Sequence, residues 1–357
     1  MRPGPSGGIV RVYDVVRTAH LERDADRTDV RIRYARTRYD FDAELLGRVD
    51  ARRQGTWSLF IELLRDPPAV IEVNEPLSFP AMSRLAAVFA ATRLRPGPNP
   101  RMVSYAIENL DPRPFITTLP ARARWTRRAW LQVAPSVWHR LDRVAFGTEQ
   151  AADLYQEVFG SPRAPRPDVR LIPHLPAAVV HESTPPRDGV VFVGDLSDRK
   201  GFPRLLEAWP IVADAEPEVR LHLIGSGTGV TAARAFALAR GNVEVSVDPP
   251  RNVIDQALRR GKVLVLPSER GRRWREQVGL PIVEGLARGC LIVTTTETGL
   301  APWLEAHGHW VLPPGDTSAL AAALIAALRS PRDVAGVIAD LPKADGRAAA
   351  DRWLTDV

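Results

Sequence analysis

The sequence has a single cysteine, and only three of its 48 basic residues are lysines. A lone cysteine, Cys290, cannot form an internal disulfide, and no group of cysteines and histidines has the spacing of a zinc site. The longest apolar run, Ala319 to Leu328, is ten residues. A helix needs roughly 18–20 apolar residues to span a bilayer, and no signal-peptide pattern opens the chain. We therefore expect a cytoplasmic protein in which Cys290 is a small buried side chain.

The net charge of +6 is concentrated in one segment, Arg113 to Arg143, which holds one acid, Asp142. Its seven arginines are Arg113, Arg122, Arg124, Arg127, Arg128, Arg140 and Arg143. They are interleaved with Phe115, Trp125, Trp130, Leu131 and Trp138. This mixture favours peripheral contact with an anionic membrane, on its inner face. The alternative is a solvated helix with its tryptophans in the core. No nucleic-acid module accompanies the arginines, so no nucleic acid is expected as a partner.

Short β-branched runs alternate with amphipathic stretches along the chain, and this pattern predicts parallel sheets wound by helices. The 357 residues suffice for two domains. Strands are expected at 30–34, 69–73, 101–107, 143–146 and 169–172, and then at 190–193, 219–224, 243–245, 263–266, 291–293 and 310–312. Helices are expected in the second half at 203–213, 231–239, 253–259, 282–288 and 318–328.

A proline-rich stretch without sustained period separates the two halves. We expect an N-terminal Rossmann-like domain over 1–175, a linker over 176–188, and a second Rossmann-like domain over 189–340. A C-terminal helix over 341–357 would pack back on the first domain. Ligands of such sheets bind outside the carboxyl ends of the strands, so the two domains would face a cleft.

The most informative motif separates two expected strands near the end of the second half. Pro281 suits the first turn of a helix and Gly279 precedes it, so free backbone N–H groups there would form an anion site. Glu276 before the helix and Glu284 within it could present both carboxylates as hydroxyl acceptors. The alternative is an ion pair between Glu284 and Arg288, one turn later, with the glutamate also complementing the helix dipole.

Two strand-to-helix turns upstream add further candidates. Strand 190–193 is followed by a glycine turn and by the adjacent cations Arg199 and Lys200, which could clamp a phosphate. The alternative is a solvated loop in which Asp198 offsets the cations. The glycines of 225–229 do not complete a dinucleotide-binding fingerprint and predict a tight turn.

Taken in this order, the motifs resemble the C-terminal half of retaining GT-B glycosyltransferases of the group 1 family. The resemblance covers about residues 189–328. It is carried by Phe192-Val-Gly-Asp-Leu196, Arg199-Lys-Gly201, Leu223-Ile-Gly-Ser-Gly227, Val265-Leu-Pro-Ser268, the spaced pair Glu276 and Glu284, Gly299-Leu300 and Pro313-Pro-Gly-Asp316. It implies an α/β protein with the GT-B architecture, which is two Rossmann-like, doubly wound parallel-sheet domains facing a cleft.

The resemblance also implies roles for the candidate residues. Glu284 would hold the nucleotide ribose, and Glu276 would act as a catalytic residue that binds donor-sugar hydroxyls. The diphosphate would be neutralised by Lys200, Arg199 and the backbone of Gly279, Leu280 and Pro281. No metal and no cofactor are expected, because cations and a helix N-terminus can neutralise a leaving diphosphate.

Three features depart from the pattern of the family. Asp195 stands where the family usually has an arginine, and Gln277 and Val278 replace the usual glycine and aromatic residue. Gly7 and Gly8 resemble the glycine-rich loop that follows the first strand of the N-terminal sheet, with too few residues before them for a strand. We therefore expect that first strand to be missing.

The N-terminal half resembles the family more loosely. Where these enzymes often place a histidine near the donor sugar, the chain has Glu108 at the end of strand 101–107, a candidate catalytic residue whose alternative role is a strand-end cap. Glu75, after the preceding strand, is a further candidate. Asp24 and Asp26 lie in a polar stretch, which favours a solvated turn over a metal site.

The sequence thus predicts a metal-independent, retaining glycosyltransferase. It would move a sugar from a nucleotide diphosphate sugar to a hydroxyl acceptor, either lipid-linked or a small natural product. The leaving phosphate would serve as the base, since no protein nucleophile is evident. Two alternatives remain: a nucleotide-sugar epimerase or phosphorylase on the same fold, and a degenerate, non-catalytic protein that binds nucleotide sugars.

Overall fold

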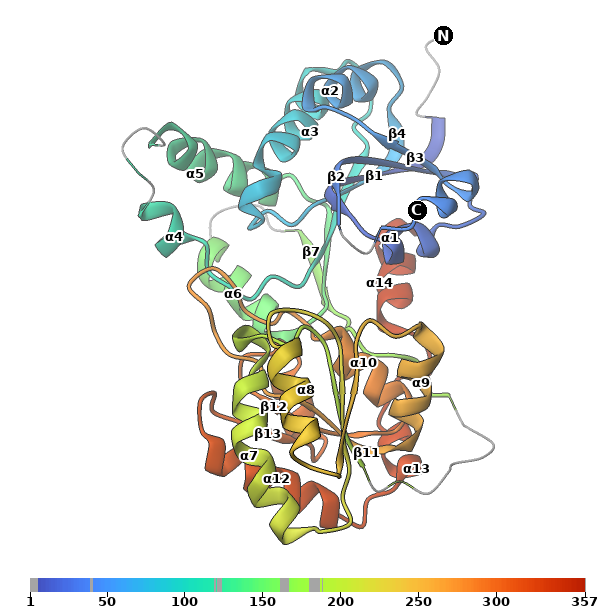
Figure 1. Ribbon diagram of the computed structural model, residues 1–357. Coiled ribbons are helices and arrows are strands. Elements are labelled where there is room, and N and C mark those ends of the chain that lie inside the picture. The colour runs from blue at the N-terminus through green and yellow to red at the C-terminus, as the bar shows by residue number, and fades with distance from the viewer. Residues whose placement is uncertain are drawn as a thin grey trace. The chain divides into compact units, whose positions relative to one another are not determined.

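The computed structural model describes residues 6–38, 41–118, 120, 124–160, 167–179, 187 and 189–356 (Figure 1). Its internal contacts divide the chain into two compact units. Unit 1 comprises Met1–Phe146, Ala152–Leu171 and Ala350–Val357, and unit 2 comprises Gly147–Ala151 and Ile172–Ala349. Of the predicted linker, 176–179 belong to unit 2, whereas 180–186 and 188 lie outside the described residues.

Unit 1 contains a parallel sheet of seven strands in the order β3-β2-β1-β4-β5-β6-β7. The strands are β1 (Ser6–Val16), β2 (Val30–Thr37), β3 (Asp50–Arg53), β4 (Pro68–Val73), β5 (Arg101–Ala106), β6 (Arg143–Phe146) and β7 (Asp168–Leu171). Every strand expected from the β-branched runs of this half is present. The sequence pattern did not indicate β1, nor did it indicate β3, whose four residues, Asp-Ala-Arg-Arg, are not buried.

The prediction that the first strand of this sheet is missing is wrong. Strand β1 pairs with β2 on one side and β4 on the other, and Gly7 and Gly8 lie within it rather than in a loop. Val10, Val12 and Val16 are fully or almost fully buried, as a central strand requires. Arg11 interrupts the apolar pattern of this segment. Its charge is neutralised by carboxylates from distant parts of the chain, which no local pattern reveals.

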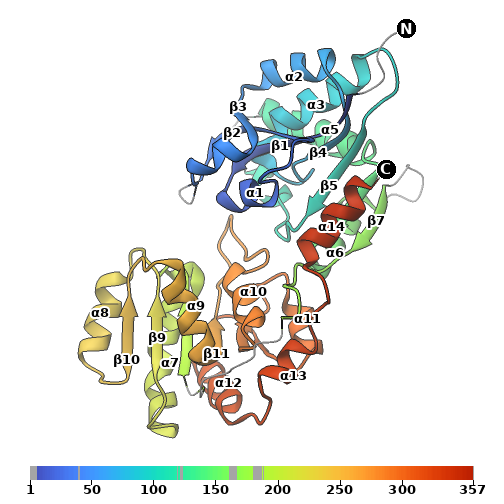
Figure 2. The same cartoon turned by 90° about the vertical axis from the view of Figure 1, so that its right-hand side faces the viewer.

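Helices cover both faces of this sheet. They are α1 (Thr18–Arg23), α2 (Thr56–Arg65), α3 (Met82–Leu94), α4 (Arg113–Thr117), α5 (Arg124–Trp138), α6 (Glu149–Phe159) and α14 (Gly346–Thr355), with short 3₁₀ turns η1 (Glu44–Arg48) and η2 (Phe79–Ala81). In unit 1, α2, α3 and α5 lie on one side of the sheet, and α1 and the end of α14 lie on the other (Figure 2). Among the described residues, no helix has both the length and the apolar character to cross a membrane.

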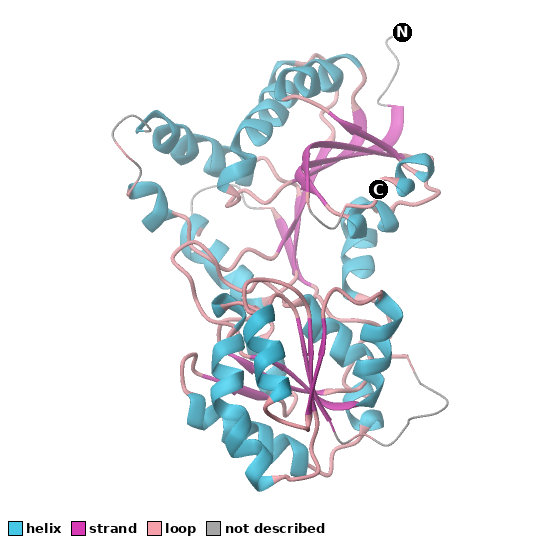
Figure 3. Ribbon diagram, viewed as in Figure 1, coloured by secondary structure: helices cyan, strands magenta, loops and turns pink. Residues whose placement is uncertain are grey.

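Unit 2 contains a parallel sheet of six strands in the order β10-β9-β8-β11-β12-β13. The strands are β8 (Gly189–Val193), β9 (Leu221–Ile224), β10 (Val243–Ser246), β11 (Gly261–Leu266), β12 (Leu291–Thr295) and β13 (Trp310–Leu312). The helices are η4 (Asp198–Lys200), α7 (Phe202–Ala215), α8 (Val230–Leu238), α9 (Arg251–Arg260), α10 (Leu280–Ala287), α11 (Ala301–Ala306), α12 (Thr317–Arg329) and α13 (Val334–Ile338). Figure 3 shows helices on both sides of the strands. Every strand and helix expected in this half is present.

The core of unit 2 lies around its central strands. All residues of β12 and all but one of β11 are buried, as expected of strands covered by helices on both faces. Cys290 is buried just before β12, as predicted, and its burial raises the pKa of the thiol to about 12. The carboxyl ends of these strands form the edge on which the candidate residues gather.

Candidate functional site

The loops that follow β8, β9 and β11 meet closely at the carboxyl edge of the sheet in unit 2. Gly225 has a φ of +152°, and a β-carbon there would lie 1.7 Å from the carbonyl oxygen of Gly194. Gly201 has a φ of +67°, and a β-carbon there would lie 1.8 Å from the carbonyl oxygen of Pro267. Only glycine fits such approaches. The tight turn predicted at 225–229 is therefore present, and Gly201 brings the Lys200 turn against the end of β11.

Lys200 and Glu276, 76 residues apart in the sequence, form an ion pair at this edge. Their side chains are each 11% exposed. The hydroxyl of Ser268 donates to the same Glu276 oxygen, Oε2, at 3.1 Å. The backbone of Gly299 donates to the Glu276 carbonyl at 3.0 Å, which ties this loop to the end of β12. The structure thus brings two predicted site residues together, and it pairs them with each other.

Arg199 forms a second ion pair at the same edge. Its Nη2 lies 2.8 Å from Oδ2 of Asp195, and the hydroxyl of Ser197 donates to that oxygen at 2.9 Å. The indole of Trp274 lies beside both cations, with its ring centre 5.0 Å from Cζ of Arg199 and 5.3 Å from Nζ of Lys200. Sequence reasoning missed Trp274. The available signal was a tryptophan among arginines directly before Glu276.

Helix α10 begins as predicted, with Gly279 before it at a φ of +76° and Pro281 in its first turn. Glu284 lies one turn further along and pairs with Arg251, Nη1 to Oε1, at 3.1 Å. Arg288 pairs instead with Asp255, so the expected alternative of a Glu284–Arg288 ion pair is not formed. Burial raises the pKa of Glu284 above its ordinary value. The Glu284 carboxylate remains partly exposed beside a surface arginine.

In unit 1, a pair of carboxyl groups lies at the ends of β4 and β5. Oε2 of Glu75 accepts hydrogen bonds from the backbone of Ile107 (3.0 Å) and Glu108 (2.8 Å) and from the hydroxyl of Tyr155 (3.3 Å). Burial, followed by the charge of Glu108, raises the pKa of Glu75 to about 8. Oε1 of Glu108 accepts from the backbone of Leu110 at 3.1 Å, the strand-end cap expected as the alternative role.

Comparison with known families identifies unit 2. Residues 187–330 match the model of the family described as "Glycosyl transferases group 1". The matched range contains Lys200, Glu276 and Glu284. No curated protein sequence matches the chain significantly.

Solved structures of glycosyltransferases share the fold over nearly the whole chain. The lipopolysaccharide outer core galactosyltransferase WaaB (apo form) has 12% identity and a TM-score of 0.66, covering 97% of this chain and 98% of its own. Anabaena Alr3699/HepE in complex with UDP has 15% identity and a TM-score of 0.67, covering 97% and 95%. Trehalose-6-phosphate synthase OtsA has 13% identity and a TM-score of 0.65, covering 98% and 99%. The predicted family and enzyme class, a glycosyltransferase with the GT-B fold, are confirmed.

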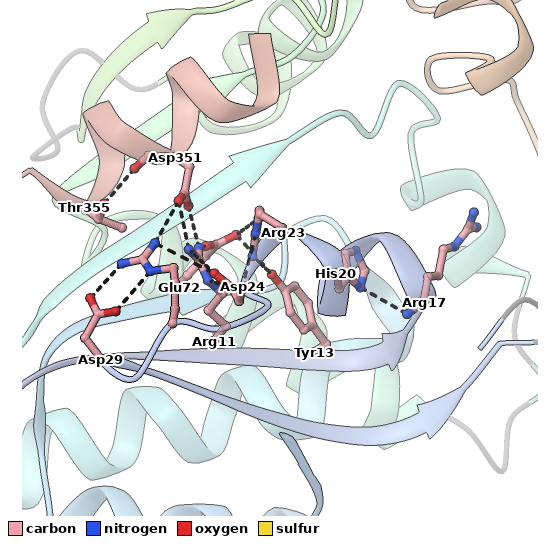
Figure 4. A network of polar contacts seen from close by, with 11 residues as sticks. Arg11, Tyr13, Arg17, His20, Arg23, Asp24, Asp29, Glu72, Asp351 and Thr355 are labelled. Carbon is pink, nitrogen blue, oxygen red and sulfur yellow. Dashed lines mark hydrogen bonds and ion pairs between the residues drawn. The ribbon is translucent and has the colours of Figure 1, made fainter. Parts of the chain in front are cut away.

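A buried charge cluster lies elsewhere in unit 1 of this glycosyltransferase (Figure 4). Arg11 pairs with Asp24 at 2.9 Å, with Asp351 of α14 at 2.6 Å, and with Glu72 of β4. Asp24 is fully buried, so the prediction of a solvated turn is wrong for this residue, because a distant arginine neutralises it. Asp26 is exposed, as predicted. The cluster fastens the end of α14 to the sheet.

The arginine-rich segment of the glycosyltransferase divides into two groups. Arg113, Arg140 and Arg143 bind neighbouring groups: Arg113 pairs with Asp111, Arg140 pairs with Asp142, and Arg143 donates to the carbonyl oxygen of Trp353 at 2.7 Å. Arg127 and Arg128 of α5 are exposed, and Trp125 and Leu131 beside them are 68% and 47% exposed. Trp130 and Trp138 are buried. Arg122 and the side chain of Arg124 lie outside the described residues.

Proposed function

We propose that this glycosyltransferase moves a sugar from a nucleoside diphosphate sugar to a hydroxyl acceptor, and that it binds the donor at the carboxyl edge of unit 2. The observation that carries the proposal is that Lys200, Glu276 and the start of α10 lie at one edge of the unit 2 sheet. This sheet lies within the residues that match the glycosyl transferase family model. A structure that shares the fold, that of HepE, contains UDP-glucose, which supports a donor of this class.

Each group at this edge has a chemical role in the proposal. The Glu284 carboxylate accepts hydrogen bonds from the ribose hydroxyls. Lys200 leaves Glu276 for a phosphate oxygen when the donor arrives, and the freed Glu276 carboxylate accepts sugar hydroxyls. The backbone amides of Gly279 and Leu280 point to the same anion, since the first N–H groups of a helix lack partners within it. The anomeric configuration is retained, and the leaving phosphate serves as the base, without a metal ion.

The competing proposal is a non-catalytic protein that binds nucleotide sugars. It draws on Asp195, which pairs with Arg199 and so removes one cation from the leaving group. Incubation of the purified chain with UDP-glucose and UDP-N-acetylglucosamine separates the two proposals. Release of UDP, by hydrolysis or transfer, supports the enzyme. Binding of a nucleotide sugar without turnover across an acceptor panel supports the binding protein.

Substituting Glu284 tests the position of the donor. In Glu284→Gln, we expect UDP to bind about tenfold or more weakly, because a charge-assisted hydrogen bond to ribose is worth about 1–3 kcal/mol. The measurement is calorimetric titration, with GDP and ADP used in turn if UDP does not bind. Glu305→Gln, an exposed change on α11, is the control and should bind normally. Unchanged affinity in a folded Glu284→Gln would remove the residue from the donor site.

We further propose that the exposed part of α5 contacts an anionic membrane and that the acceptor is lipid-linked. The described residues narrow the candidate surface to Arg127, Arg128, Trp125 and Leu131, which are exposed together near the start of the helix. Arginines bind anionic headgroups, and an exposed tryptophan and leucine suit the interfacial region. Unit 1 would then carry the acceptor side of the reaction.

Liposome co-sedimentation tests the membrane contact. We expect the chain to sediment with vesicles that contain acidic lipid and to be released by salt. Arg127→Gln with Arg128→Gln should weaken binding roughly 30-fold, at about 1 kcal/mol for each arginine. The control, Arg65→Gln with Arg93→Gln, changes two exposed arginines on α2 and α3. Equal sedimentation of the two double variants would exclude a membrane role for α5. Release of the unaltered chain from the vesicles by duplex DNA would exclude it as well.

A further inference from the structure

An arginine-rich loop follows β11 at the carboxyl edge of unit 2. Its residues 269–275 include four arginines, and it projects beyond the end of β11, ahead of α10 (Figure 2). Gly271 and Trp274 form an antiparallel bridge, in which the Gly271 N–H donates to the Trp274 carbonyl at 2.9 Å. Arg272 and Arg273 therefore form a two-residue tip. We call residues 269–275 the arginine hairpin.

The arginine hairpin is fixed against the turn that contains Arg199 and Lys200. At its start, the Glu269 N–H donates to the carbonyl oxygen of Arg199 at 3.0 Å. At its other end, the Trp274 ring lies 5.0 Å from the Arg199 guanidinium carbon and 5.3 Å from the Lys200 ammonium nitrogen. Both arms thus contact the turn that carries two of the proposed diphosphate ligands, and the two tip residues directly precede Trp274.

The cations that the sequence suggested for the diphosphate are already neutralised. Lys200 pairs with Glu276, and Arg199 pairs with Asp195. Each pair has no net charge. A nucleoside diphosphate carries at least two negative charges at neutral pH, and these two pairs offer it no net positive charge to balance them.

The arginine hairpin carries the excess positive charge of this edge. Arg270, Arg272 and Arg273 are exposed. Within the part of the chain that the structure describes, no carboxylate pairs with Arg270 or Arg272. Arg275 differs from them, because its Nε lies 2.8 Å from Oε2 of Glu297. The charge that no described carboxylate compensates therefore includes Arg272 at the tip and Arg270 beside it.

We infer that Arg272 and Arg273 bind the diphosphate of the donor and stabilise it as the leaving group. The inference rests on the proposed function. In that reaction the bond between the anomeric carbon and the β-phosphate oxygen breaks, and its electron pair leaves with the nucleoside diphosphate. The anomeric carbon bonds to the acceptor oxygen, whose proton passes to a phosphate oxygen. A guanidinium group can donate two parallel hydrogen bonds to phosphate oxygens, and its positive charge stabilises the negative charge that develops on the leaving diphosphate.

Titrations of uridine and UDP into the full-length chain test the inference, with the GDP and ADP series as substitutes if UDP does not bind. In Arg272→Gln with Arg273→Gln, we expect the Kd of UDP to rise at least tenfold and its dependence on salt to become shallower. Uridine affinity should stay within twofold, because uridine carries no phosphate. The control is Arg220→Gln with Arg329→Gln, which removes the same charge at the amino-terminal edge of the sheet.

Three outcomes decide between the possibilities. A selective loss of UDP affinity in the hairpin variant alone supports the inference. Unchanged UDP affinity in a hairpin variant with normal thermal stability overturns it, as does an equal loss in the control variant. Failure of the unaltered chain to bind any nucleoside diphosphate would instead overturn the proposed function on which the inference depends.

Discussion

Arg11→Ala is expected to lower the free energy of unfolding of unit 1 by about 3–5 kcal/mol, because it leaves buried carboxylates without their counter-charge. Arg11 has no solvent exposure, and it pairs with Asp24, Glu72 and Asp351. Native-state hydrogen exchange at the amides of β1 measures this loss. Exchange at β12 should stay unchanged, which separates the effect on unit 1 from any effect on unit 2.

Two further variants make the Arg11 prediction specific. Arg48→Ala breaks an ion pair with Asp26 in which both side chains are more than half exposed, and it should have little effect on stability. Asp351→Asn removes one carboxylate and leaves Arg11 paired with two others, so its effect should lie between these extremes. If the β1 amides are equally protected from hydrogen exchange in Arg11→Ala and Arg48→Ala, the buried charge cluster around Arg11 contributes little to stability.

Glu75→Gln is expected to become more stable relative to the unaltered chain as the pH rises from 5 to 8, by about 2–4 kcal/mol. The pKa of Glu75 is about 8 in the folded chain, against an ordinary value of 4.5. Below pH 4.5 both states are protonated. Between 4.5 and 8 only the unfolded chain releases the proton, so the stability of the folded state falls and reaches its lower level above pH 8. Glutamine keeps the acceptor oxygen and does not titrate.

Urea unfolding at pH 5, 6.5 and 8 measures this difference. Only the change between variant and unaltered chain is compared, so titrations shared by both cancel. Glu44→Gln, an exposed change in the same unit, is the control and should show no trend with pH. A constant difference between Glu75→Gln and the unaltered chain would show that Glu75 is ionised in the folded state at pH 6.5.

The β-branched runs predicted most of the fold, because a strand that is buried on both faces is an uninterrupted run of apolar residues. The runs that became β11 and β12 are almost wholly buried, and their positions were evident from the residues alone. Two strands were the exceptions. Strand β1 was missed because Gly7 and Gly8 were matched to the loop after the first strand, whereas they lie within it. Strand β3 was missed because it is polar, and it lies at the edge of the sheet.

The candidate site could be predicted in its residue types but not in its pairing. Glycine spacing and the proline of α10 indicated which residues gather at the carboxyl edge of unit 2. Nothing in the local pattern indicated that Lys200 would pair with Glu276, or that Asp195 would take up Arg199. The alternative considered for Glu284 was an ion pair with Arg288, whereas Arg251 from another helix is its partner.

By itself, the sequence determined the two parallel sheets, the order of most strands and helices along the chain, the start of α10 and the family of residues 187–330. These features depend on periodicity and on glycine and proline positions, which act within a few residues. Only the tertiary structure decided which charged groups lie together: Arg11 with carboxylates as far as residue 351, Glu75 with Glu108, and the cations at the carboxyl edge of unit 2 with their acids. Electrostatic pairing depends on distance in space, and folding brings together groups that the sequence keeps far apart.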